Sequence, residues 1–230
     1  MKKEFRTYFI WLLLCSFGVQ AAEDSLYDFH WLDPDKAVYV LQNKIHKKEK
    51  TFFVDLAYVA NQTATFQDTR GILINPGYFW HEEWGIEVLF LKYQNQNNAA
   101  FKNVKTVNSV VPYVRRHDQT MALGLVWAPF YGKVNAFNEI YYFDWNLSGG
   151  LAQVTTEQNL NSAQNNLAIA YESESDLGLY LKTQVKFHLS QTWHLGIGYL
   201  MTMYKAPGAR GSGENLEYNS DLLFQVGWSH

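Results

Sequence analysis

Residues 177–189 read LGLYLKTQVKFHL, and alternate positions differ in character. One set is apolar except for Thr183, whereas the other carries Tyr180, two lysines, a glutamine and a histidine. This period-2 alternation indicates a strand with one apolar and one polar face. Residues 193–203 and 216–228 alternate in the same way.

These runs are too long for an ordinary β-sandwich, whose strands most often have about 5–6 residues. They match the roughly 9–11 tilted residues that a strand needs to cross a bilayer. Their polar face also carries charges, which are costly in a dry core unless they are paired. The pattern therefore predicts a transmembrane β-barrel, with apolar side chains facing lipid and polar ones facing the lumen. A soluble secreted β-sandwich is the alternative fold.

The first 21 residues have the three parts of a secretory signal: a basic start, an apolar run over 8–17 and small residues near Ala21. That run is too short for a spanning helix, so we expect a signal peptide that is cleaved near Ala21. Cys15, the single cysteine, lies in this signal, and the mature chain would have no disulfide. An uncleaved anchor and a lipid on Cys15 are the alternatives.

Residues 22–50 are predicted to form an N-terminal periplasmic segment before a barrel domain over 51–230. Asp33-Pro34-Asp35 is typical of a helix start, whereas residues 38–41 favour a strand. Four lysines and His46 then cluster within residues 44–50. This cluster would contact lipid headgroups or the cell wall, or would form a solvated turn.

Eight strands are predicted in residues 51–230, antiparallel and joined up-and-down. Long polar connections at 94–117 and 149–176 alternate with short turns such as 130–133, as periplasmic turns alternate with extracellular loops in bacterial barrels. Pro76 should cause a bulge or lose a ladder bond. The predicted strands cover 52–60, 71–80, 84–93, 121–129, 137–147, 177–189, 193–203 and 216–228.

Tryptophans support this topology independently. Aromatic side chains gather at membrane interfaces, where one surrounding is apolar and the other polar. Five of them fall at the predicted periplasmic strand ends: Trp80, Trp84, Trp127, Trp193 and Trp228.

Charged side chains on the inward face are the candidate site. An eight-stranded barrel is just wide enough for side chains to fill it, and each unpaired buried ion would cost several kcal/mol. A polar lumen plugged by ion pairs is the favoured interpretation, and a narrow path for ions or small solutes is the alternative. The set is Asp55, Glu87, Asp144, Lys182, Lys186, His188 and Asp221.

Several motifs resemble those of the outer-membrane β-barrel domain family common in myxobacterial and predatory Gram-negative bacteria, small barrels of the OmpA or OmpW kind. The resemblance covers most of the mature chain and implies a barrel in the outer membrane, without catalytic residues. The C-terminal strand is also similar to the signal read by the barrel-insertion machinery. The motifs are VYVLQNK at 38–44, residues 52–58, GYF at 77–79, EWGIE at 83–87, WAPFYGK at 127–133, Phe143-Asp144, and Phe224, Val226 and Trp228.

Enzymatic readings receive less support from the residues. His188 and Ser190 resemble a motif of the lipid A deacylases, but a serine nucleophile needs a histidine base and an orienting acid. The nearest acids in sequence, Asp176 and Glu214, are predicted at the opposite end of the barrel.

No motif predicts a cofactor or a metal, because the histidine of residues 81–83 has no second histidine four residues later. The glycines of 208–213 precede a strand rather than the helix of a phosphate loop. The net charge of −3 gives no reason to expect a nucleic-acid partner.

We therefore expect a monomeric outer-membrane barrel with a structural or surface-interaction role and no catalysis. Its partners would be outer-membrane lipids and lipopolysaccharide, whose phosphates residues 115–117 could contact from an extracellular loop unless these residues are merely solvated. A narrow pore and a lipid A-modifying hydrolase are the alternative functions.

Overall fold

The computed structural model describes residues 44–108, 111–136, 139–165, 169–207 and 213–230. The chain divides into two units, Met1–Asn43 and Lys44–His230, and every described residue belongs to the second. The predicted signal peptide, its cleavage site and most of the predicted segment 22–50 therefore lie outside the described residues.

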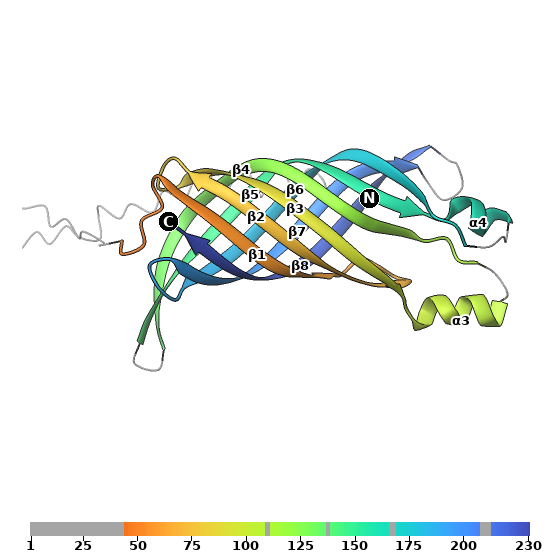
Figure 1. Ribbon diagram of the computed structural model, residues 1–230, viewed down its shortest axis with the longest axis horizontal. Coiled ribbons are helices and arrows are strands. Elements are labelled where there is room, and N and C mark those ends of the chain that lie inside the picture. Colours follow the sequence, from red (N-terminus) through yellow and green to blue (C-terminus); the bar gives the residue numbers. More distant parts are fainter. Residues whose placement is uncertain (1–43, 109–110, 137–138, 166–168, 208–212) are drawn as a thin grey trace, which may run out of the picture. The chain divides into compact units, whose positions relative to one another are not determined.

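Eight antiparallel strands form one closed barrel in which each strand pairs with the next and β8 pairs with β1 (Figure 1). This closure confirms the predicted up-and-down barrel and excludes the sandwich. The strands are β1 (Thr51–Asn61), β2 (Gln67–Phe79), β3 (Trp84–Asn97), β4 (Arg115–Ala136), β5 (Glu139–Gln158), β6 (Glu172–His188), β7 (Trp193–Pro207) and β8 (Glu214–Ser229).

The strands are staggered, which sets the width of the barrel. Following directly paired residues once around the barrel leads from Thr51 to Asn61, a displacement of ten residues along β1. Strand number and stagger together fix the radius, and eight strands leave an interior that side chains can fill. The path runs through Phe79, Gly85, Val126, Ser148, Lys182, Leu200 and Asp221.

The two ends of the barrel differ. Short turns at 80–83 and 189–192 lie at one, which we call the turn end. At the other, the loop end, helix α3 (Ala99–Asn108) follows β3 and helix α4 (Leu160–Asn165) follows β5 (Figure 1).

The predicted long polar connections are partly wrong. β3 continues to Asn97 and β4 begins at Arg115, so strand and helix replace most of 94–117; β5 likewise runs to Gln158 and β6 begins at Glu172 within 149–176. Hydrophobic alternation records which part of a strand faces an apolar medium, whereas the backbone ladder continues beyond it. The pattern therefore ended before the strands did.

The predicted turn at 130–133 is also wrong. β4 passes through it to Ala136, with a register shift between Trp127 and Phe130 that accommodates Pro129. Aromatic contacts keep the two strands together there: Phe130 stacks on Trp145 with ring centroids 5.3 Å apart. The β4–β5 hairpin consequently projects past the neighbouring turns (Figure 1).

Pro76 behaves as predicted, without a bulge. β2 keeps one register with β1 and β3, but residues 75 and 76 have no paired partners on β3. Proline has no N–H to donate, and the side-chain amide of Asn75 instead donates to the carbonyl of Val88 at 3.1 Å. A neighbouring side chain thus replaces the missing ladder bond.

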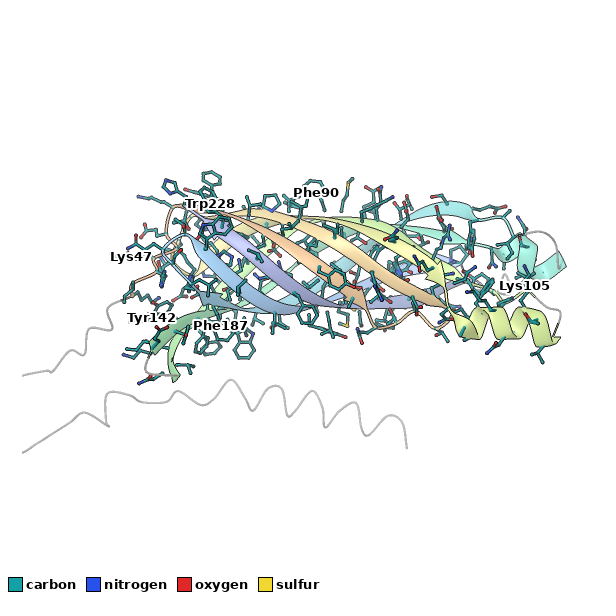
Figure 2. The ribbon with its side chains drawn as sticks, turned by 60° about the horizontal axis from the view of Figure 1, so that its bottom comes forward. Lys47, Phe90, Lys105, Tyr142, Phe187 and Trp228 are labelled. Atoms are coloured by element: carbon teal, nitrogen blue, oxygen red, sulfur yellow. The ribbon has the colours of Figure 1, made fainter. Side chains whose placement is uncertain are left out.

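Large apolar side chains cover the outside of the barrel (Figure 2). Ile72, Leu123, Leu181 and Ile197 are each more than half exposed, although aliphatic side chains normally gain free energy by leaving water. Such a continuous exposed apolar surface marks contact with another apolar phase. Within the described residues, no helix is long and apolar enough to span a membrane.

Candidate functional site

All seven predicted interior residues point into the barrel. Asp55, Glu87 and Asp221 are fully buried, and Asp144, Lys182, Lys186 and the His188 side chain are nearly so. The structure separates them into three clusters at the turn end and one isolated acid beyond an apolar layer.

The first cluster joins β6 to β3. Lys182 Nζ lies 2.6 Å from Glu87 Oε2 and donates to Asn75 Oδ1 at 2.7 Å. Tyr180 donates its hydroxyl proton to the other carboxylate oxygen of Glu87 at 3.1 Å. Buried charges persist only when paired and hydrogen-bonded in this way.

The second and third clusters share one design, in which an aspartate bridges a lysine and a histidine. Asp55 Oδ2 lies 2.7 Å from Lys186 Nζ, and Asp55 Oδ1 lies 2.6 Å from His194 Nε2. Asp144 likewise binds His188 Nε2 at 2.7 Å and accepts a hydrogen bond from Lys48 Nζ.

Asp221 stands apart from these clusters. It accepts hydrogen bonds from Tyr93 at 2.6 Å, Asn61 at 2.8 Å and Asn219 at 2.9 Å. Among the residues that the structure describes, no cation forms an ion pair with it. The predicted single network of seven residues is therefore not formed.

An apolar layer crosses the lumen between Asp221 and the turn-end clusters. Every strand contributes to it, and Leu73, Leu89, Leu200 and Leu223 are 0–1% exposed. The predicted polar lumen therefore contains an apolar layer that was not predicted. This layer could have been predicted in part from residues 88–91, VLFL, which are apolar on both faces of the strand.

Residues 44–50, which we call the strap, lie across the turn end. The backbone N–H groups of Lys48 and Glu49 both donate to Glu82 Oε2, at 3.0 and 3.2 Å. Those of Ile45 and His46 donate to the hydroxyl of Tyr131 at 3.3 and 3.5 Å. The strap thus bonds to the barrel mainly through polar groups.

His46 and Lys48 carry the strap into the barrel mouth. The His46 ring stacks on His188 with centroids 4.2 Å apart, and Lys48 is 7% exposed with its ammonium on Asp144. Burial, reinforced by the charge of His188, lowers the pKa of His46. Neither sequence interpretation of this basic cluster, lipid contact or a solvated turn, accounts for the burial of Lys48.

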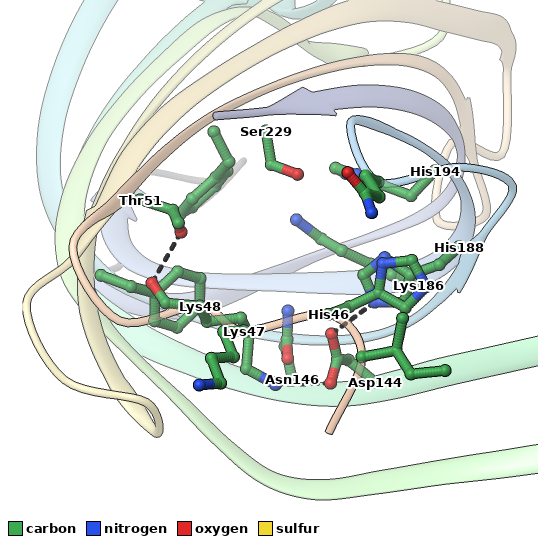
Figure 3. Close-up of a pocket in the computed structure, with 14 residues that line it drawn as sticks. His46, Lys47, Lys48, Thr51, Asp144, Asn146, Lys186, His188, His194 and Ser229 are labelled. Atoms are coloured by element: carbon green, nitrogen blue, oxygen red, sulfur yellow. Dashed lines mark hydrogen bonds and ion pairs between the residues drawn. The ribbon is translucent and has the colours of Figure 1, made fainter. Parts of the chain in front are cut away.

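A cavity of about 310 Å³ lies between the strap and the turn-end clusters (Figure 3). Figure 3 shows Lys186, His188 and His194 converging on it from β6 and β7, with Asp144 and Asn146 of β5 beside the strap. Its remaining wall includes Phe53, Phe79 and Ser229.

The five predicted interfacial tryptophans lie at the turn end, each 39–52% exposed. Trp84 stacks on Trp127 across β3 and β4, and Trp193 is paired with Trp228 across β7 and β8. Trp80 lies in the turn before β3.

The geometry does not assemble a hydrolase site around Ser190. Its Oγ accepts hydrogen bonds from the backbone N–H groups of Thr192 and Trp193 within its own turn. Asp144 does orient His188, although the two residues are too far apart in the sequence for this contact to be predicted. Within the described chain, however, no hydrogen bond joins His188 to Ser190. Nor is any group of three His, Cys, Asp or Glu side chains there arranged to hold a metal ion.

No protein-family model and no curated protein sequence matches this chain. Similar solved structures include the N-terminal β-barrel domain of Pseudomonas aeruginosa OprF, at TM-score 0.49 and 11% identity over 79% of this chain and 98% of that one. OprG, an outer membrane protein of the same organism, has a TM-score of 0.45 and 12% identity, over 80% of this chain and 97% of OprG. Ail, the attachment invasion locus protein of Yersinia pestis, has a TM-score of 0.43 and 12% identity, over 79% of this chain and 99% of Ail.

The likeness is one of fold alone. The resemblance to the myxobacterial barrel family stays a prediction.

Proposed function

We propose that this protein is a small integral barrel of the outer membrane with a closed lumen, and that its role is structural or interactive rather than transport or catalysis. The apolar outer surface with tryptophans at its turn-end edge supports insertion, because interfacial aromatics flank the lipid-facing band of such barrels. Outer-membrane lipids and lipopolysaccharide would surround it.

The apolar layer inside the barrel carries the proposal. All eight strands contribute side chains to it, so ions passing along the lumen would have to lose their water between mainly aliphatic side chains. The buried ion pairs on its turn-end side do not extend through it. These features favour a closed barrel over a narrow pore.

The surface role would belong to the loop end, where strands and helices extend beyond the apolar band. Lys105 marks α3 at that end in Figure 2. Of the arginines predicted to touch lipopolysaccharide, Arg116 pairs with Glu157 at 2.6 Å and lies over the Tyr171 ring at 3.7 Å, while Arg115 donates to the carbonyl of Pro207 at 2.6 Å. Both are engaged within the protein, so exposed lysines of α3 are better candidates for phosphate contacts.

Two measurements test this proposal. Membrane fractions run on SDS gels with and without boiling should show a heat-dependent shift, because a closed ladder pairs its backbone groups internally. The purified barrel in planar bilayers should then give no reproducible conductance steps. A soluble protein without the shift would refute membrane insertion, and regular steps would establish the pore instead.

Catalysis is tested separately. Lipid A from cells making the protein should have an unchanged mass, beside a working deacylase as positive control. Loss of an acyl chain that depends on Ser190 would contradict the proposal.

A further inference from the structure

The turn-end cavity has the size of a small-molecule site. Its volume of about 310 Å³ falls at the lower end of the range of roughly 300–1,000 Å³ found for ligand pockets. A water takes up about 30 Å³ of liquid, so the space corresponds to on the order of ten non-hydrogen atoms. The strap forms one wall (Figure 3), and five strands supply charged or polar side chains, β1, β5, β6, β7 and β8.

Lysine N–H groups are in surplus around this cavity. Lys48 and Lys186 are 7% and 4% exposed, and within the described chain each ammonium has a single carboxylate partner, Asp144 and Asp55 respectively. An ammonium carries three donors, so each lysine retains two. Lys186 also lies 4.3 Å from the centre of the Phe53 ring, which offers it no acceptor atom.

Charge favours the same kind of ligand. Lys47, Lys48 and Lys186 line the cavity against one acid, Asp144, and Asp55 behind Lys186 adds a second. Both carboxylates already bridge a lysine and a histidine, which leaves little capacity for binding a cation. The cavity surroundings thus carry a net positive charge even with all histidines neutral.

Other buried polar atoms in the wall lack partners. Asn146 Oδ1, His46 Nδ1 and His194 Nδ1 make no hydrogen bond within the described chain. Buried polar groups are ordinarily paired, so these atoms need a hydroxyl-bearing or hydrated ligand. Phe53, Phe79 and Ile45 supply apolar walls beside them.

We propose that the cavity under the strap binds a small hydroxylated oxyanion, a carboxylate or phosphate compound held by Lys48 and Lys186. Carboxylate and phosphate share this chemistry, since both accept charge-assisted hydrogen bonds from ammonium groups. The site does not depend on the surface role proposed above, and it can exist whether or not the loop end has partners.

The test is calorimetric titration of the full barrel, refolded in a neutral detergent, with citrate and with inorganic phosphate at constant ionic strength in chloride. Lys48→Gln removes one cation while His188 still binds Asp144. Ser229→Phe fills the cavity and leaves every charge in place. Lys92→Gln is the matched control, because Lys92 is an exposed lysine on the outside that pairs with Asp118.

One equivalent of citrate, phosphate or both should bind to the wild type and to Lys92→Gln. Binding to Lys48→Gln should weaken roughly tenfold or more, as expected for loss of one hydrogen bond to a charged group, and Ser229→Phe should lose it. Binding of citrate alone identifies a carboxylate site, and binding of phosphate alone a phosphate site.

Heat-dependent mobility on SDS gels shows whether each variant is folded. If Lys48→Gln does not fold, the binding measured with Ser229→Phe tests the proposal. Absence of binding for both anions overturns the proposal. So does equal binding in Ser229→Phe, or equal weakening in Lys92→Gln, since either result would reflect general surface charge. A failure here leaves the gel shift and the conductance result untouched, so the two proposals are separable.

Discussion

Lys182 shows how strongly single residues depend on their partners inside this barrel. It lies almost fully buried with its ammonium between Glu87 and Asn75. The pair is expensive to bury and is stable only as a unit, so the two partners should be strongly coupled.

Replacing Lys182 with methionine should therefore lower the free energy of unfolding by about 3–5 kcal/mol, because Glu87 would remain buried without a cation. The double variant Lys182→Met with Glu87→Leu should recover most of this loss. Urea unfolding of the barrel in lipid vesicles, followed by tryptophan fluorescence, measures both. The exposed pair of Lys92 and Asp118 is the control, and Lys92→Met should cost less than about 1 kcal/mol. Equal effects of the two lysine variants would contradict the interpretation.

His46 should make docking of the strap sensitive to pH. Its pKa is lowered in the docked state by burial and by His188, so the undocked strap binds a proton more readily. Docking is complete above the ordinary histidine pKa of about 6.5 and weakens as the pH falls below it toward the lowered value. Asp144 opposes this shift without reversing it.

Hydrogen exchange of the strap amides at several pH values, corrected for intrinsic exchange, measures this docking. Protection should decrease below about pH 6.5 in the wild type. In His46→Gln it should be lower throughout and show a smaller change with pH. A pH response unchanged by the substitution would assign it to another group.

At the scale of elements, the outer part of the β4–β5 hairpin, residues 134–136 and 139–141, pairs only with itself and lies outside the closed ladder. Residues 130–136 pair with β5 alone, since β3 pairing ends at Trp127. Exposed Val134 and Ile140 lie on this extension. Barrel stability should therefore be independent of residues 134–141.

Replacing residues 134–141 with a two-residue Asn-Gly turn, which suits a tight hairpin, should leave the heat-dependent gel shift intact. Tyr131 and Tyr142, which stack on each other, are retained in this variant. A barrel that no longer resists SDS would show that the extension is needed for closure or assembly. Deletion of an equal length within β6 provides the control that should abolish the shift.

For the whole molecule, the apolar layer should decide whether the lumen conducts. Changing Leu89, Leu200 and Leu223 together to serine would make polar a layer that all three help to build. The triple variant should give conductance steps in planar bilayers where the wild type gives none. Removing three buried leucines costs stability, so folding must first be verified by the gel shift. A folded but silent triple variant would show that the ion-pair clusters also block the lumen.

Residue spacing alone predicts the strands wherever they cross the apolar band. Alternation along β6, β7 and β8, the inward charges and the lost bond at Pro76 are local properties of the chain, and each could be read from residue spacing. Such a prediction also has a physical limit. Where the strands leave the apolar band the alternation ends, so the full length of β4 and β5 was not visible.

The pairing of the buried charges, in contrast, depends on the folded barrel. The stagger of the strands around the closed barrel makes Glu87 bind Lys182 and Asp55 bind Lys186. Leucines from β2, β3, β7 and β8 separate Asp221 from these ion pairs. Lys48 reaches Asp144 from outside the strands altogether. Spacing along one strand fixes the face on which a side chain lies, but its partners depend on register and closure, which are properties of the whole ladder.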